Sequence, residues 1–161
     1  MTYAHSDITI GLQALDVTST VQNHAIGFRT KGFDPTYGQA EFIYLKGLAS
    51  TAIGETVIYD ENANTTKRAV AGDRGPCAVA LSANVANQYG WYQISGSAIV
   101  KVAAAVAAAA PCYVTATAGS IDDAVVATDK IDGMRFKTAD GTPSAGFAVV
   151  QMDRPCLNGG G

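Results

Sequence analysis

Short runs of β-favouring residues, each bounded by turn residues, recur from residue 42 to residue 152. Each run is rich in Val, Ile, Tyr, Phe or Ala, and its length suits a single strand rather than a helix. Runs that repeat at this spacing are typical of a sandwich or a barrel. The nine predicted strands cover residues 42–45, 56–59, 77–81, 90–94, 98–102, 112–117, 124–127, 134–137 and 146–152.

The composition also favours strands. The chain contains 28 Ala, 17 Gly, 15 Thr and 14 Val, but only three Glu and six Lys. Several exposed helices would need many more Glu, Lys, Gln and Arg residues on their solvent faces. Because 161 residues match one average domain, we predict an all-β fold, a compact barrel or sandwich of short antiparallel strands.

Residues 102–110 are the segment that fits this interpretation least well. Alanine, the best helix former, fills seven of these nine positions. The run nevertheless lacks an N-cap and has no charged residue after Lys101, and Pro111 disfavours the helical conformation at Ala110. We therefore predict a strand and a connector here, with a helix as the alternative.

The first 40 residues differ in texture from the rest of the chain. Glycine and proline interrupt them repeatedly, and no apolar run is long enough for a secure strand. We predict an extended N-terminal arm (residues 1–40) and a β body (residues 41–161). A largely alternating apolar row in the arm suits addition of a strand to a partner's sheet, so we expect it to contact another subunit or a larger assembly. This row consists of Ile8, Ile10, Leu12, Leu15 and Val17.

Two further residues of the body are candidates for partner contacts. Trp91 and Tyr92 are neighbours in a predicted strand, so their side chains point to opposite faces. One should enter the core while the other faces outward, and we expect Trp91 to anchor an interface; ordinary surface exposure and sugar stacking are the alternatives. Arg154 follows the last strand, where it forms either a surface ion pair or a contact to a larger assembly.

The sequence spells out no enzyme motif. It has no Gly-x-Ser-x-Gly, His-Glu-x-x-His, Gly-x-Gly-x-x-Gly or P-loop pattern, and His5 and His24 lie in the arm, away from any cluster of carboxylates. We predict no catalytic residue and no cofactor. Four aspartates lie close together, but their spacing fits no EF-hand, so we interpret them as solvated turns, with an ion site as the alternative. They are Asp122, Asp123, Asp129 and Asp132.

Three cysteines, Cys77, Cys112 and Cys156, are far apart and odd in number. Without a C-x-x-C pair they predict neither a zinc site nor a redox dithiol, and buried free thiols are the simplest interpretation. The N-terminus has no signal-peptide pattern, so we expect synthesis in a cytoplasm.

Charge and hydropathy exclude several partner classes. The chain has 11 basic and 14 acidic residues and a net charge of −3, which gives no electrostatic reason to expect nucleic acid or anionic lipid. The longest uncharged apolar run, residues 102–111, is about half the length that a bilayer requires. We predict no nucleic-acid partner and no membrane partner.

A weak internal repeat is present. Residues 54–70 align without gaps on residues 109–125, and both pieces predict a strand, a polar turn and a short strand. Three positions are identical, and a further strand follows each piece. A three-stranded meander used twice would explain the pattern, although shared hairpin composition would also produce it.

Four segments resemble the small capsid decoration, or cement, proteins of tailed bacteriophages. The resemblance covers about two thirds of the chain and is one of texture: short strands, small residues, an irregular N-terminal arm, a tryptophan strand and a closing Asp-Arg-Pro. No strict signature carries it. The segments are GQAEFIYLKG (38–47), GWYQISG (90–96), DGMRFK (132–137) and GFAVVQMDRP (146–155).

The resemblance implies a β-tulip-like body, homo-oligomerisation and attachment to the outer surface of an icosahedral shell, where the protein staples major capsid subunits together. The expected partners are thus the major capsid protein and further copies of the chain, as a trimer rather than a dimer. The expected location is the virion surface, and no enzyme activity is expected. A head-fibre or carbohydrate-binding module is the main alternative, followed by a two-carboxylate hydrolase.

Overall fold

A computed structural model describes residues 3–6, 11–47, 51–103 and 105–158 of the chain. These residues form strands and turns and no helix, so the predicted all-β class is confirmed. The strands are β1 (Ala4–His5), β2 (Arg29–Asp34), β3 (Gly38–Gly47), β4 (Thr56–Tyr59), β5 (Thr65–Arg68), β6 (Gly75–Ala80), β7 (Tyr89–Lys101), β8 (Pro111–Val114), β9 (Ile121–Asp122), β10 (Lys130–Phe136) and β11 (Phe147–Leu157).

All eleven strands belong to one sheet, in the order β1-β2-β3-β5-β4-β6-β7-β11-β10-β8-β9. Two further pairings, β3 with β7 and β6 with β11, fold this sheet back on itself. The strand pairs are antiparallel except for β3 and β5, which run parallel. Nowhere in the described part of the chain is there a helix of the length and apolarity that crossing a membrane requires.

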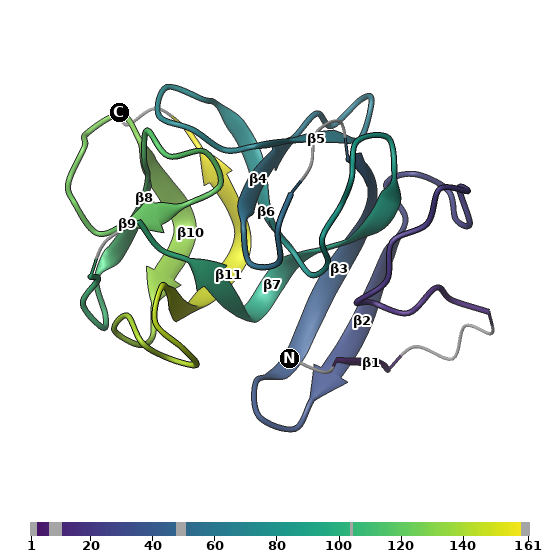
Figure 1. Cartoon of the computed structure of the whole chain (residues 1–161), viewed down its shortest axis with the longest axis horizontal. Helices are drawn as coiled ribbons and strands as arrows, with labels where there is room; N and C mark the ends of the chain where they lie inside the picture. Colours follow the sequence, from purple (N-terminus) through teal and green to yellow (C-terminus); the bar gives the residue numbers. More distant parts are fainter. Residues whose placement is uncertain (1–2, 7–10, 48–50, 104, 159–161) are drawn as a thin grey trace.

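The extra pairings create two rings of strands that share β7. In the first ring, β3, β5, β4, β6 and β7 follow one another, and β7 pairs with β3 to close it. In the second ring, β7, β11, β10, β8 and β9 follow one another. A parallel bridge between Val102, next to the end of β7, and Ile121 of β9 closes the second ring. Figure 1 shows β8 to β11 on one side of β7 and β1 to β3 on the other.

A glycine lets β7 pass from one ring to the other. At Gly96 the backbone φ is 92°, a conformation that glycine adopts without strain. A Cβ atom at this position would lie 2.5 Å from the Gln39 carbonyl oxygen of β3. With glycine at this close approach to β3, the strand continues through position 96. The two predicted strands at 90–94 and 98–102 therefore form one long strand, β7.

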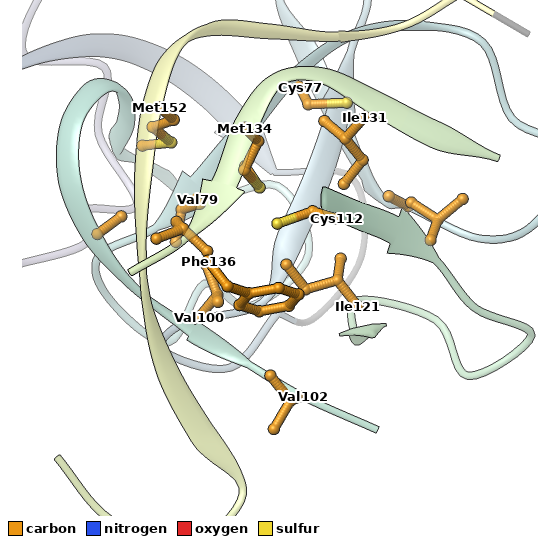
Figure 2. Packing of buried hydrophobic residues seen from close by; sticks show 14 of the residues in the cluster. Cys77, Val79, Val100, Val102, Cys112, Ile121, Ile131, Met134, Phe136 and Met152 are labelled. Carbon is orange, nitrogen blue, oxygen red and sulfur yellow. The ribbon is translucent and has the colours of Figure 1, made fainter. Parts of the chain in front are cut away.

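Each ring encloses its own apolar core. The first core contains Ile43, Leu45, Val57, Tyr59, Ala78, Ala80, Tyr92 and Ile94. The larger second core lies inside the second ring and also takes in residues of β4 and β6 that face away from the first ring. Figure 2 shows Cys77 of β6 beside Ile131 of β10, and Val79 of β6 beside Phe136 of β10. Small and medium side chains make up most of this second core. A chain with few large apolar residues can therefore still form a buried core.

A third core lies outside the first ring and contradicts the predicted arm. It consists of Leu15, Ala40, Phe42, Tyr44 and Trp91, with Tyr3, Leu12, Leu81 and Tyr89 packed around it. Residues from the first 28 positions therefore cover the outer face of β3 and β7. The boundary predicted at residue 40 falls inside β3, and β2 pairs with β3 over its whole length. The described residues among the first 40 are thus part of the body, because their apolar side chains complete its packing.

The internal repeat has the same strand register in both copies. The gapless alignment places Tyr59 on Val114 and Thr66 on Ile121. In the structure, Tyr59 pairs with Thr66 across two strands, and Val114 pairs with Ile121 in the same way. The parallel pair Gly47–Thr66 likewise falls on the bridge Val102–Ile121. The unit from β3 to β7 and the unit from β7 to β11 are therefore built in the same way, around the shared β7.

Two other local predictions had different outcomes. The described residues of 102–110 form no helix, as predicted from the missing cap and from Pro111. The predicted strand at 124–127 is wrong. The strand here is β9, which ends two residues before position 124, and Val125 is exposed in the loop that follows it. All three cysteines are free, with Cys77 and Cys112 buried and Cys156 partly exposed.

Candidate interaction surfaces

Residues 11–28, here called the N-terminal segment, lie along the outer side of the first ring (Figure 1). Backbone hydrogen bonds fasten this segment at its middle and at its C-terminal end. Ser19 and Tyr89 exchange a pair of N–H to O bonds of 2.9 and 2.8 Å. Near the C-terminal end, the Gly27 N–H donates to Tyr44 O at 2.7 Å, and the Tyr44 N–H donates to Phe28 O at 2.8 Å. The segment is therefore attached to the ring as an added layer.

Gln13 holds the start of the N-terminal segment through its backbone. Its carbonyl oxygen accepts hydrogen bonds from Trp91 Nε1 at 2.9 Å and from His5 Nε2 at 3.0 Å. Its N–H donates to His24 Nε2 at 2.9 Å. Two imidazoles and an indole thus satisfy the backbone of one residue, and the Nε2 atom of each histidine is hydrogen-bonded to it.

The Gln13 side chain extends the same network. Its Oε1 accepts a hydrogen bond from the Tyr44 hydroxyl at 3.1 Å, and its Nε2 donates to Val17 O at 2.6 Å. Burial raises the pKa of the Tyr44 phenol, so this phenol stays a donor over the physiological range. No sequence signal pointed to Gln13, because a glutamine in an irregular stretch has no characteristic pattern.

His24 must stay neutral to make its hydrogen bond. Its Nε2 accepts the Gln13 N–H, and a protonated imidazole has no lone pair with which to accept. Burial lowers the pKa of His24 below its ordinary value of 6.5, and the neighbouring His5 lowers it further. His24 also packs edge-on against Tyr44, with ring centroids 5.0 Å apart, and lies 5.5 Å from Trp91.

The structure separates the predicted interface row. Leu15 is only 3% exposed and packs in the third core, and Leu12 is partly buried beside it. The prediction that Leu15 contacts a partner is therefore corrected: its cover comes from its own chain. Val17 is 47% exposed and remains available for a contact. Ile8 and Ile10 lie outside the described residues.

Trp91 is also corrected as an interface anchor. Its side chain is 0% exposed, because His5, His24 and Phe28 surround it on the outer face of β7. Tyr92 points into the first ring, where its hydroxyl contacts Thr66 and Asn84. Strand alternation did place these neighbours on opposite faces, but both faces of this part of β7 are covered.

The outward side of the N-terminal segment carries apolar side chains without cover. Val17, Val21 and Phe28 are 47%, 65% and 39% exposed. The segment is thus two-sided: Leu12, Gln13 and Leu15 face the ring, while these three residues face solvent. Large apolar side chains exposed along one short segment can mark an interaction surface.

Arg154 occupies an unusual position in β11. Three residues of β11, Asp153 to Pro155, stand opposite the single Gly133 of β10, which makes a bulge. Arg154 has a φ of 45°, in the left-handed region that non-glycine residues rarely adopt. Its guanidinium reaches across to β3, where NH2 lies 3.1 Å from Glu41 Oε2. The predicted ion pair is therefore present, and the side chain remains exposed.

The four clustered aspartates serve separate structural roles. Asp122 accepts the Ala124 N–H and Asp123 accepts the Ala107 N–H. Asp129 accepts the Gly72 N–H, and Asp132 pairs with Lys130 at 3.1 Å. Among residues that the structure describes, no group of three His, Cys, Asp or Glu side chains is arranged to hold a metal ion.

Glu55, whose side chain is buried beside the shared strand, was not predicted as a key residue. Its Oε1 lies 3.2 Å from Lys101 Nζ, its Oε2 accepts the Ala52 N–H, and Gly119 packs against its side chain. This carboxylate ties the loop before β4 to the end of β7. It is isolated from other carboxylates by its two cationic neighbours and so resembles a structural link, not half of a catalytic pair.

No protein-family model matches the sequence, and no curated protein matches it either.

Proposed function

We propose that this chain is a non-enzymatic structural protein that attaches to the outer surface of an icosahedral phage head. There it stabilises contacts between major capsid subunits, together with further copies of itself. The observation that supports this proposal best is the two-sided N-terminal segment, with Val17, Val21 and Phe28 exposed on a backbone that is already fastened.

Exposed apolar side chains on a fixed backbone suit docking. Covering them would gain about 25 cal/mol for each Å² of apolar surface removed from water. Because Gln13 and the bridge from Ser19 to Tyr89 already hold the backbone, a partner would order few additional residues. A low ordering cost leaves more of the burial free energy for affinity.

The rest of the molecule suits a passive role. Many of the described carboxylates and both histidines are engaged in ion pairs, turns or packing, and both ring interiors are filled with side chains. A compact protein of this kind would stabilise an assembled shell by mass action, because it binds the assembled state and not the separate subunits.

A carbohydrate-binding or head-fibre module is the second candidate. Such a module would use exposed aromatic rings as stacking platforms. The single tryptophan is fully buried, and the large exposed aromatic side chains among the described residues are Phe28 and Phe33. No specific contact favours this candidate over the first.

The proposal is tested by binding to heads of the phage that encodes the chain, prepared without the protein. We expect the full chain to co-sediment with these heads and the double variant Val17→Asp, Val21→Asp to bind at least about tenfold more weakly. Val125→Asp is the matched control, because Val125 is 77% exposed in the second ring, away from the N-terminal segment.

Both variants must first show the same unfolding transition as the parent chain. Equal binding by the double variant and the control would rule out the N-terminal segment as the docking surface. Failure of the parent chain to bind heads at all would refute the proposed function.

A further inference from the structure

A small hollow between β2, β3 and β11 carries more positive than negative charge. It measures about 170 Å³ and is lined by Arg29, Thr30, Lys31, Glu41 and Arg154. Three of these side chains are cationic and one is anionic, although the whole chain has a net charge of −3. The hollow is therefore a local departure from the overall charge of the molecule.

Glu41 is the one acidic residue in this lining. It lies 3.1 Å from Arg154 NH2 and 4.0 Å from Lys31 Nζ. Among the described residues, no carboxylate is paired with the Arg29 guanidinium within 4.0 Å. In the hollow beyond, Lys67 and Arg74 have Asp73 and Asp129 as partners.

The fold brings the three cations together from separate strands. Arg29 and Lys31 are two residues apart in β2 and both exposed, so they share the face that turns away from the third core. Lys31 is paired in register with Glu41 of β3. Arg154 comes from β11, and only the bulge opposite Gly133 directs it toward Glu41.

The backbone at Arg154 suggests that this position serves more than packing. A non-glycine residue in the left-handed region costs roughly 1 kcal/mol or more, and such residues concentrate where a side chain must be aimed. Bulges serve the same purpose at sheet edges and binding sites. An exposed ion pair with Glu41 would not by itself repay this cost.

We propose that this hollow binds a carboxylate side chain on an acidic segment of the shell protein, an inference that rests on the proposed function. The incoming carboxylate pairs with Arg29 and shares Arg154 with Glu41. Arginine binds carboxylates through two parallel hydrogen bonds, and Glu41 shows that a carboxylate fits beside Arg154.

The surroundings favour a peptide over a free phosphate or a polyanion. Phe33 is 48% exposed on the same face of β2 as Arg29 and Lys31. The adjoining hollow, which shares Arg29, is lined by Ile26 and Glu61 beside the buried Ile43 and Tyr59. The exposed Phe33 ring beside the cations suits the apolar side chains that flank an acidic residue in a protein segment, and the negative net charge disfavours long polyanions.

The site is tested on the isolated full chain, without phage heads. A hexaglutamate peptide is titrated into isotopically labelled protein at low ionic strength, and the arginine Nε–Hε signals are followed by NMR. We expect the Arg29 and Arg154 signals to shift and saturate, and Arg29→Gln to weaken binding by about tenfold. Arg135→Gln, an exposed arginine on β10, is the matched control and should bind like the parent chain.

Glu41→Gln gives a result that a general loss of structure would not produce. Glu41 competes with the peptide for Arg154 and Lys31, so its removal should strengthen hexaglutamate binding severalfold. Weaker or unchanged binding in this variant would overturn the proposal. Equal binding by Arg29→Gln and Arg135→Gln, or tighter binding of inorganic phosphate at the same arginines, would overturn it too.

The two proposals fail in different ways. If the parent chain binds heads but hexaglutamate does not move the Arg29 and Arg154 signals, the acidic-peptide site is wrong and the structural role stands. If hexaglutamate binds but the chain does not bind heads, the hollow is an anion site and the proposed function is wrong.

Discussion

His24 is the residue through which acid should loosen the N-terminal segment. Its imidazole accepts the Gln13 N–H, and the titratable groups that face it are His5 and the Tyr44 phenol. Because neither is a carboxylate, no anion among the described residues is seen to stabilise a protonated His24. Protonation would remove the acceptor and place a positive charge against buried rings.

We expect the free energy of unfolding to fall in mild acid. The pKa of His24 is lowered on folding, so the unfolded chain takes up a proton on this residue more readily than the folded chain. The contribution of neutral His24 is complete above pH 6.5 and is lost as the pH falls through 6.5 and then through the lowered pKa. Urea unfolding measured from pH 7.5 to pH 5 checks this.

His24→Gln is the matched variant, because a glutamine oxygen can accept the Gln13 N–H and does not titrate. Its stability should change less than that of the parent over this pH range. Equal losses in both proteins would show that other groups cause the acid sensitivity.

Trp91 and Tyr92 show what single residues in the sequence could predict. The alternation of a strand correctly placed them on opposite faces, but the prediction that one of them faces outward is wrong, because both are buried. The sequence could not show that residues 11–28 fold back over Trp91, because that contact joins positions far apart in the chain. Cys77 is the opposite case: it was predicted to be a buried thiol, and burial raises its pKa to about 12.

Among the elements, the N-terminal segment departs most from expectation. Its alternating apolar row correctly indicated that Leu12 and Leu15 need cover. A local pattern shows that a side chain must be buried, but it does not show which chain buries it. The sequence analysis missed Arg29 and Lys31 as candidate site residues. Interpreting residues 1–40 as an arm hid the regular alternation of exposed and buried residues in β2.

Leu15→Ala separates the two accounts of this segment. Leu15 is buried against Phe42 and Trp91 in its own chain, so its truncation should lower the free energy of unfolding by roughly 2–5 kcal/mol. Val17→Ala is the control and should change it by no more than about 0.5 kcal/mol. Both values come from urea unfolding of the isolated protein.

The contrary outcome is specific. If Leu15→Ala unfolds like the parent while binding to heads drops, Leu15 contacts a partner and the packing described for the third core is wrong.

The whole molecule is one structural unit used twice around a shared strand. The gapless alignment of residues 54–70 on 109–125 indicated this repeat, and the matching strand pairs now support it. The closure of both rings could not be predicted, because it depends on the pairing of β3 with β7 and on the bridge from Val102 to Ile121. Predictions of strand positions do not contain such long-range pairings.

The sharing of β7 limits how the molecule can bend. Both cores pack against it, and Gly96 marks the place where it leaves one ring and joins the other. The N-terminal segment and the hollow at Arg29 lie on the outside of this rigid body, on the half that contains β2 and β3. A rigid body with its contact residues at one end is suited to holding neighbouring shell subunits in a fixed relation.

Electron cryomicroscopy of phage heads with and without the protein tests the central claim most directly. We predict density for the two fused rings on the outer surface of heads that carry the protein, with Val17, Val21 and Phe28 facing the major capsid protein. The same density should be absent from heads prepared without the chain. Heads with identical outer surfaces in both preparations, or rings bound with the N-terminal segment facing solvent, would contradict the account.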